Sequence, residues 1–459
     1  MTSSPTGEVS LEPRRIQRVY LVLMLFNTLA ASLIWGINTL FLLDAGLSNT
    51  EAFAANAFFT AGMVLFEVPT GIVADTWGRR ASYLLGSLTL AVTTMLYLAG
   101  WQAHSPFWVW AVTSLLLGLG FTFFSGATEA WLVDALNFTG FKGTLESVFA
   151  KGQIVFGIAM LAGSVGGGAI AQATNLGVPF LLRAVILGVT FAVAFFVMKD
   201  LGFTPNRGRR PLPHMKAVLG ASLHYGLGNP PVRWVMLAAP FSGGVGIYAF
   251  YAMQPYLLEL YGDEQAYGVA GLAAAIVAGA QIVGGLLVPH LGRVFRRRTT
   301  VLSMGVAAGV LLLVLVALTT SFWVAIALLV IWGLVFAATL PVQQAYLNGL
   351  IPSEQRATVL SFESLMGSSG GVVLQPVLGR AADAWSYSAS YLVAAAFQTA
   401  ALPFMLLARR ENPQSDVIDA KQPADAIAVE QLPEPGRIPA GEPGTQVAED
   451  LRRGPTEHG

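Results

Sequence analysis

Residues 71–80 read Gly-Ile-Val-Ala-Asp-Thr-Trp-Gly-Arg-Arg, and this decapeptide lies between two long apolar runs, at about 51–74 and 81–100. A helix that rises about 1.5 Å per residue needs about 20 residues to cross a hydrocarbon layer of about 30 Å, and each run is that long. The decapeptide is therefore expected to be a very short loop between two membrane spans. Such a loop cannot fold on its own, so its charges must act on the neighbouring helix ends, as a gate requires.

The composition places the rest of the chain in the membrane as well. Of its 459 residues, 54% are hydrophobic and only 11% are charged, whereas soluble globular proteins carry about 25% charged residues. Cysteine is absent, so disulfide and thiol chemistry are excluded. We expect an all-α membrane protein with twelve transmembrane helices in two six-helix bundles, its spans lying at about 17–43, 51–74, 81–100, 107–134, 146–172, 178–198, 233–260, 266–289, 299–319, 321–349, 358–382 and 388–408.

The basic residues are distributed asymmetrically about these spans. Most basic residues fall on one side of the membrane: before the first span, in the loops that follow even-numbered spans, or after the last span. Only Arg183 and Arg380 lie near the other side. The positive-inside rule then predicts a multi-pass protein of the cell membrane with both termini in the cytoplasm. Arg183 is expected to extend its charge to the outer surface.

The longest internal loop divides the spans six and six. We expect a cytoplasmic N-terminal tail at 1–16, an N-terminal six-helix bundle at 17–198, a cytoplasmic central loop at 199–232, a C-terminal six-helix bundle at 233–408 and a disordered cytoplasmic tail at 409–459. The tail is rich in Pro, Glu, Asp and Gly and has almost no aromatic residue, a composition typical of disorder.

The two halves are internal repeats. At shifts between 211 and 215 residues, Gly71 falls on Gly285 and Gly118 falls on Gly333, with further matches in four segments. Parallel repeats of this kind predict two bundles with a binding site between them.

At this point the chain resembles the major facilitator superfamily over nearly all of its membrane portion. The 71–80 string is similar to that family's signature between spans two and three, and departs from it at Thr76. Residues 163–168 resemble an antiporter signature in span five, with Ser164 in place of proline, and 125–131 with Asp134 are similar to span four of twelve-span bacterial drug–proton antiporters of the multidrug or macrolide-efflux type. The resemblance implies alternating access between the two bundles.

Two acids lie well inside predicted spans, Glu67 and Glu129. Acids in hydrocarbon are costly and therefore candidates for function. In the repeat, Glu67 falls on Gln281 and Glu129 on Gln344, and an amide keeps hydrogen bonds but cannot take up a proton. We therefore predict that proton coupling, if present, resides in the first bundle. The alternative is that each acid makes a structural hydrogen bond.

Spacing favours Glu129 of the two acids. Thr122, Ser125 and Glu129 recur at three and four residues, which predicts one polar stripe on a continuous helix. A third acid, Glu363, lies a turn and a half into span eleven, where Arg356 is a candidate partner.

The charges at the short loop suggest a cytoplasmic gate. Asp75 ends span two, Asp134 ends span four, and two arginines open span three between them; the gate residues are Gly71, Asp75, Gly78, Arg79, Arg80 and Asp134. Ion pairs that form on closing and break on opening would bias a rocking equilibrium. The alternative is that the arginines only fix topology.

Aromatic and weakly polar residues are candidates for the substrate cavity. They suit amphipathic or lipophilic molecules better than sugars, although aromatic side chains in spans also serve in packing. The candidates are Asn27, Trp35, Asn38, Ser125, Tyr248, Tyr251, Gln254, Gln281, Gln343 and Gln344.

Nothing in the sequence predicts an enzyme, a metal site, a cofactor or nucleic-acid binding; the basic run 293–298 is expected to face the membrane surface. The expected partners are a small-molecule substrate, protons and the lipid bilayer, and we expect a monomer. The favoured function is proton-coupled export of hydrophobic or amphipathic compounds. An importer of a small solute, a flippase of a lipid-like molecule and a non-transporting membrane sensor are the alternatives.

Overall fold

The computed structural model describes residues 12–205, 220, 222–286, 288–352 and 355–418, and no β-strand occurs among them. Of the predicted N-terminal tail 1–16, residues 1–11 lie outside the described residues, as do most of the central loop and the tail beyond 418. The helices are α1 (Pro13–Trp35), α2 (Asn38–Asp44), α3 (Asn49–Trp77), α4 (Arg79–Gln102), α5 (Phe107–Thr122), α6 (Ala127–Phe138), α7 (Leu145–Ala173), α8 (Gly177–Val197), α10 (Pro230–Tyr261), α11 (Tyr267–Leu286), α12 (Val288–Val294), α13 (Arg298–Leu318), α14 (Phe322–Asn348), α15 (Arg356–Ala384), α16 (Tyr387–Thr399) and α17 (Ala401–Glu411), with the π-helix η1 (Ser222–Leu227) and the 3-10 helix η3 (Gln414–Asp416).

The all-α membrane fold is confirmed. Eleven helical segments of the described chain are long and apolar enough to cross a membrane, counting α5 with α6 and α16 with α17 as single spans. The expected eleventh span, α15, has 29 residues but is less apolar, because it carries Glu363, Arg380 and Asp383 together with several serines and glycines. Its polar side chains are accommodated by neighbouring helices, as shown below.

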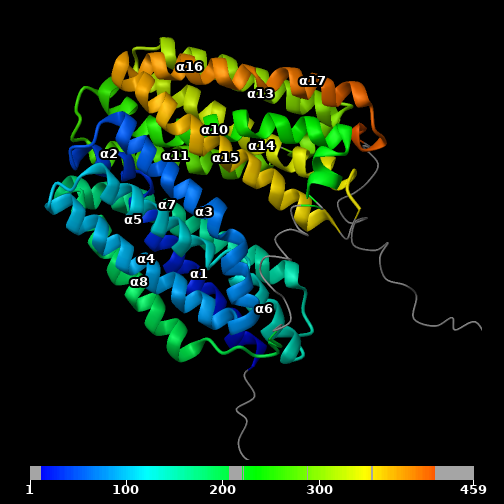
Figure 1. The fold of residues 1–459 in the computed structure, drawn as a ribbon. Helices are drawn as coiled ribbons and strands as arrows, with labels where there is room; N and C mark the ends of the chain where they lie inside the picture. The colour runs from blue at the N-terminus through cyan, green and yellow to red at the C-terminus, as the bar shows by residue number, and fades with distance from the viewer. Residues whose placement is uncertain (1–11, 206–219, 221, 287, 353–354, 419–459) are drawn as a thin grey trace, which may run out of the picture. The chain divides into compact units, whose positions relative to one another are not determined.

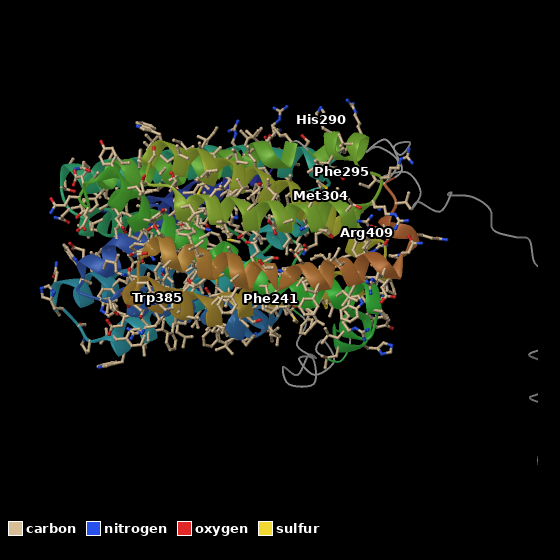
Figure 2. All side chains as sticks on the ribbon, turned by 90° about the horizontal axis from the view of Figure 1, so that it is seen from above. Phe241, His290, Phe295, Met304, Trp385 and Arg409 are labelled. Carbon is tan, nitrogen blue, oxygen red and sulfur yellow. The ribbon has the colours of Figure 1, made fainter. Side chains whose placement is uncertain are left out.

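The helices gather in chain order into two groups, α1–α8 and α10–α17 (Figure 1). One hydrophobic cluster is drawn mainly from α1–α8, and two others mainly from α10–α17. Trp385, between α15 and α16, lies at one end of the second group, and Arg409, near the end of α17, lies at the other (Figure 2). Following the orientation predicted from the basic residues, we call the end with Trp385 and Asp44 the outer end, and the end with Trp77 and Arg409 the inner end.

The first span is broken near its outer end. Helix α1 stops at Trp35 and α2 begins at Asn38, so backbone groups at the break lose their helical partners. In hydrocarbon such groups must find other partners. Gln254 of α10, which is 1% exposed, supplies a donor and an acceptor. Its Nε2 donates to the Trp35 carbonyl at 2.8 Å, and its Oε1 accepts from the Thr39 N–H at 2.9 Å. One side chain thus repairs the break and joins the two halves.

The fourth span is also broken, and the predicted polar stripe is wrong for this reason. Helix α5 ends at Thr122 and α6 begins at Ala127, with Gly126 in the left-handed region at φ +66°. Thr122 is buried and its hydroxyl donates to the Leu119 carbonyl. The spacing of three and four residues to Ser125 and Glu129 therefore does not follow one helical face.

Glycines of the fifth span permit close helix contacts. Gly163 and Gly167 of α7 pack on Ser32 and Leu33 of α1, and Gly168 packs on Gly271 of α11 with no room for a Cβ atom. The glycine-rich string 163–168 thus lies where α7 meets a helix of its own half and a helix of the other half.

The outer end carries charge-assisted hydrogen bonds between the halves. The Asp383 carboxylate of α15 accepts the N–H groups of Asn49 at 2.9 Å and Thr50 at 2.8 Å, as well as the Thr50 hydroxyl. Asn49 and Thr50 begin α3, so the carboxylate meets the positive end of a helix dipole. Tyr387 also donates to the Asn49 side chain. Across the described residues, the hydrogen bonds between the halves run from this end to Thr60 and Gln375, and none joins the inner ends.

The third span of each half is capped by an acid that follows the sixth. Asp200, just past α8, accepts the Arg80 N–H of α4 at 2.8 Å. Asp416, past α17 and 0% exposed, accepts the Thr299 N–H of α13 at 2.7 Å and the Thr299 hydroxyl at 2.9 Å. The disordered tail predicted for 409–459 therefore starts too early: α17 runs to Glu411, and residues up to 418 dock on the start of α13.

We predict that Asp383→Ala shifts the protein toward an outer-open state. The variant removes three hydrogen bonds that hold α3 to α15, and loss of a cap of this kind costs about 1 kcal/mol, roughly a fivefold change in population. The chain has no cysteine, so spin labels at introduced cysteines in place of Ala103 and Thr320 report the outer distance by pulsed electron resonance. Asp263→Ala is the matched control, because within the described part of the chain Asp263 bonds to residues of its own loop. An unchanged distance distribution in Asp383→Ala contradicts the prediction.

We also predict that Asp416→Ala lowers the thermal unfolding midpoint of the purified protein. Two hydrogen bonds to a buried carboxylate are lost, and removal of a helix cap costs about 1–2 kcal/mol. Glu264→Ala, in an exposed outer loop, is the control. Equal midpoints for the two variants would show that the cap contributes nothing.

Candidate functional site

A cavity of about 570 Å³ lies between the two halves. Its walls are mostly apolar and aromatic, with Trp35, Phe59 and Phe121 from the first half. The second half contributes Phe250, Tyr251, Trp332, Phe336, Gln281, Thr339, Gln343, Gln344, Glu363, Ser364 and Ser368, among others. A pocket of this size, apolar with a few polar groups, suits one small-molecule ligand.

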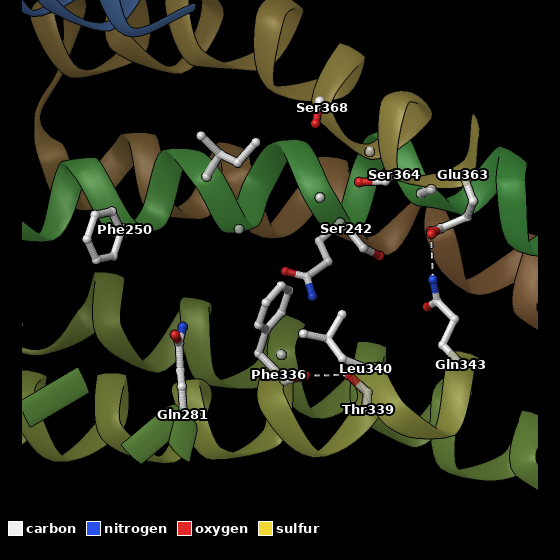
Figure 3. A pocket seen from close by; sticks show the side chains of 18 of the residues that line it. Ser242, Phe250, Gln281, Phe336, Thr339, Leu340, Gln343, Glu363, Ser364 and Ser368 are labelled. Atoms are coloured by element: carbon white, nitrogen blue, oxygen red, sulfur yellow. Dashed lines mark hydrogen bonds between the residues drawn. The ribbon is translucent and has the colours of Figure 1, made fainter. Parts of the chain in front are cut away.

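One carboxylate faces this cavity. Glu363 of α15, half-buried, accepts a hydrogen bond of 2.7 Å from Nε2 of Gln343 on α14, and Figure 3 shows the pair at one end of the cavity, with Phe250 and Gln281 toward the other. The prediction that Arg356 pairs with Glu363 is wrong, because the Arg356 Nε donates to the carbonyls of Asn348 and Ile351. Among the described residues that line the cavity, Glu363 is the only Asp or Glu, and none is Lys, Arg or His.

The outer side of the cavity is closed by aromatic rings. Trp35 of α1 and Phe250 of α10 meet edge to face with ring centroids 5.4 Å apart, so the contact joins the two halves. The next turn of α10 carries Gln254, which bonds the backbone at the break between α1 and α2. We call the two rings, which line the cavity, its roof. Gln254 is not among the described lining residues and joins the halves one turn further along α10.

Half of the cavity residues predicted from sequence line it. These are Trp35, Tyr251, Gln281, Gln343 and Gln344. The other five are outside the lining. Three of them bond elsewhere: Asn38 donates to Asn56 of α3, Ser125 donates to Glu67, and Gln254 bonds the backbone at the break in the first span. Tyr248 is 0% exposed and donates to Ser390, and Asn27 is half-buried in α1.

The two acids favoured by the sequence lie outside the lining of this cavity. Glu67 of α3 is half-buried and accepts a hydrogen bond of 2.6 Å from the Ser125 hydroxyl, which is free to reach it because the fourth span is broken there. Glu129 stands in the first turn of α6 and is exposed. Their repeat partners, Gln281 and Gln344, do line the cavity.

The short loop after α3 is organised around Arg79. Its Nη1 lies 2.6 Å from the Asp75 carboxylate, and its Nε lies 3.9 Å from that of Asp134 on α6, so one guanidinium links the ends of three helices. Arg80 has different partners: its side chain donates to the Phe195 carbonyl of α8 and stacks over the Phe195 ring at 5.1 Å.

Gly78 is required at this loop for two reasons. Its φ of +110° and ψ of 156° are accessible essentially only to glycine. A Cβ atom there would also collide with the Asp200 carboxylate that caps α4. Burial raises the pKa of Asp200, and the hydrogen bond and charge of Arg80 oppose this. Gly71, by contrast, has open space where a Cβ atom would stand. Asp200 carries no local sequence signal, since only the fold brings it to the loop.

Arg183 corrects another expectation. It does not reach the outer surface, because it is 2% exposed inside the first half. Its Nε donates to Thr94 at 3.2 Å, its Nη1 donates to the Ala30 carbonyl at 3.3 Å, and its guanidinium lies 5.7 Å from the centre of the Phe121 ring. No ion pair with a carboxylate is seen for it among the described residues, so one aromatic ring of the cavity wall rests on a buried cation.

In the part of the chain that the structure describes, no three His, Cys, Asp or Glu side chains are grouped to hold a metal ion. Within that part, the site consists of an apolar cavity with one carboxylate, a closed outer roof and a charged loop at the inner end.

Known structures share this fold. The nucleoside transporter NupG aligns with a TM-score of 0.72 at 11% identity, covering 85% of this chain and 98% of that one. A peptide transporter POT in complex with sulfate aligns with a TM-score of 0.67 at 13% identity, covering 88% and 95%. A bacterial homologue of the human lysosomal transporter Spinster, inward-facing and unoccupied, aligns with a TM-score of 0.63 at 15% identity, covering 90% and 99%.

No curated protein sequence matches the chain. The sequence does match the Major Facilitator Superfamily over residues 20–373 and again over 266–452, which together span most of its length. With the helical fold and the central cavity already in place, this match shows that the chain belongs to the Major Facilitator Superfamily, a transporter family.

Proposed function

We propose that this transporter is a proton-coupled exporter of hydrophobic or amphipathic small molecules, located in the cell membrane with both termini in the cytoplasm. The observation that carries the proposal is the single carboxylate among the described side chains of an apolar and aromatic cavity. Apolar walls accept lipophilic molecules of varied shape, while few polar groups impose a specific hydrogen-bonding pattern.

Glu363 is the proton carrier in this proposal. It lines the cavity, and its partner Gln343 is a neutral amide that can donate to the ionised form or accept from the protonated form. A substrate, above all a lipophilic cation, would compete with the proton for the carboxylate. Glu67 and Glu129 remain candidates for the same role, supported by the sequence but outside the cavity lining.

The 71–80 loop is the inner gate in this proposal. In a conformation whose inter-half hydrogen bonds lie toward the outer end, Arg79 already pairs with Asp75 and approaches Asp134 within the first half. These charges therefore hold the ends of α3, α4 and α6 as one unit, and the open space at Gly71 would receive the other half on closing.

Glu363→Gln is expected to abolish proton-driven transport and to preserve exchange. In proteoliposomes, a pH gradient should drive uptake or release of ethidium by the wild type, and the variant should fall to the level of protein-free liposomes, because an amide takes up no proton. Ethidium counterflow without a pH gradient should persist in the variant, since the cavity is intact.

Glu67→Gln and Glu129→Gln are the matched variants for this experiment. If either uncouples ethidium movement from protons while Glu363→Gln does not, the cavity carboxylate is not the proton carrier. The direction of ethidium movement under the imposed gradient separates an exporter from an importer. Nile red and fluorescein, as neutral and anionic probes, test the charge preference.

The two glycines of the gate should respond differently to alanine. Gly78→Ala imposes backbone strain of about 1–3 kcal/mol and displaces Asp200 from the start of α4, so we expect a lower thermal midpoint and lost transport. Gly71→Ala meets no atom in this conformation. We expect it to keep the wild-type midpoint and to slow transport, because it fills space needed on closing. Wild-type transport in Gly71→Ala would remove Gly71 from the gate.

A further inference from the structure

A second cavity, of about 1010 Å³, lies away from the substrate cavity. It is a groove between the start of α1, the loop before α7 and the first turns of α7. The α1 side contributes Glu12, Pro13, Arg14, Gln17, Arg18 and Leu21, and the other side contributes Phe141, Lys142, Gly143, Thr144, Ser147, Val148 and Lys151.

The charges of this groove are unbalanced. Arg14 and Arg18 face it from successive turns of α1, and Lys142 and Lys151 face it from the other side, whereas Glu12 is the only acid among the described residues of the lining. Like charges four residues apart on a helix repel one another. None of these four cations takes part in an ion pair within the described chain. The arrangement is therefore one that an anion would stabilise.

Two helix starts add to the positive potential. Helix α1 begins at Pro13 and α7 at Leu145, both beside the groove, and the side chains of their N-cap residues, Glu12 and Thr144, make no capping hydrogen bond. The first N–H groups of a helix have no partner within the helix, and its dipole places partial positive charge there. The start of α1 offers few such groups, because Pro13 has no N–H and the Arg15 N–H already donates to the Glu12 carbonyl. An anionic oxygen in the groove would therefore meet the start of α7 as well as the four cations.

Part of the remaining lining is apolar. Leu21, half-buried, lies about one turn further along α1 than Arg18, and Phe141, also half-buried, lies on the other side of the groove. Together they give the groove an apolar wall beside its four cations. A soluble anion would leave this wall unused, whereas an acyl chain would cover it.

We propose that this groove binds the phosphate headgroup of an anionic membrane phospholipid, with the cations around the phosphate and the start of an acyl chain along Leu21 and Phe141. The helix starts that form it belong to α1 and α7, which also contact each other through Gly163 and Gly167. The bound lipid thus fastens the inner ends of these two helices. Cationic grooves between spans at the cytoplasmic surface are suited to such headgroups.

The test uses the purified full-length protein in neutral detergent, titrated with phosphatidylglycerol and, separately, with phosphatidylcholine. Bound lipid is measured by native mass spectrometry, and the unfolding midpoint is followed in parallel. We expect phosphatidylglycerol alone to bind and to raise the midpoint. Arg14→Gln/Arg18→Gln should weaken its binding roughly tenfold or more, because each basic residue near an anionic lipid contributes separately.

Arg409→Gln/Arg410→Gln is the matched control, because it removes two exposed arginines at the inner end that lie outside the groove. Lys142→Gln/Lys151→Gln is a second groove variant, in case the first fails to fold. Equal losses in groove and control variants, or equal binding of phosphatidylcholine, would overturn the proposal. A midpoint raised as much by inorganic phosphate as by phosphatidylglycerol would also overturn it, since the site would then be one for a soluble anion.

Discussion

The contact between Asp383 and the start of α3 is the interaction on which the arrangement of the two halves depends. A carboxylate on one half accepts two N–H groups and a hydroxyl from the first turn of a helix on the other. Helix starts always carry unpaired N–H groups, so this bond supplies what α3 needs in any case and fixes the outer ends together. Two further contacts join the halves: the Trp35 and Phe250 rings, which form the roof of the cavity, and the hydrogen bonds of Gln254 to the break in the first span. Because the described inter-half bonds stop near Thr60 and Gln375, the inner ends are left free to separate.

The need of backbone N–H and C=O groups for hydrogen-bond partners explains where the two spans are broken. A helix can break within a membrane only where protein groups replace the lost backbone partners. At Gly36 and Ile37 the replacement comes from Gln254, so that break is tied to closure of the outer end. At 123–126 the chain turns through Gly126, and the freed Ser125 bonds Glu67. The Gln254 hydrogen bonds at the first break would be lost if the halves separated at the outer end, so the energy of the break depends on the conformation.

Patterns that repeat along the chain were predictable, and contacts made only by folding were not. Apolar run lengths predicted the helical membrane fold. Of the residues proposed for a substrate cavity, Tyr251 of span seven and Gln343 of span ten line the cavity between the halves. The polar stripe on span four failed because periodicity assumes an unbroken helix, and Gly126 breaks it. Arg183 was misplaced because its sequence position near a span end does not reveal partners on α1 and α4. Asp200, Asp383 and Asp416 act on helices far away in sequence, so no local pattern marks them.

The repeat comparison gains a physical meaning when it is set beside the cavity. Glu67 and Glu129 lie outside the lining while Gln281 and Gln344 belong to it, so the amide in each repeated pair faces the site and the acid does not. A permanent charge is costly beside apolar walls, whereas an amide keeps its hydrogen bonds at a lower cost. Among the described lining residues the one carboxylate, Glu363, is held by an amide, Gln343. No Lys, Arg or His is among the described lining residues, so we propose that the proton affinity of Glu363 depends on what occupies the cavity. We propose that this dependence couples the proton to the substrate, and that the charges gathered around Arg79 serve the motion of the first half alone.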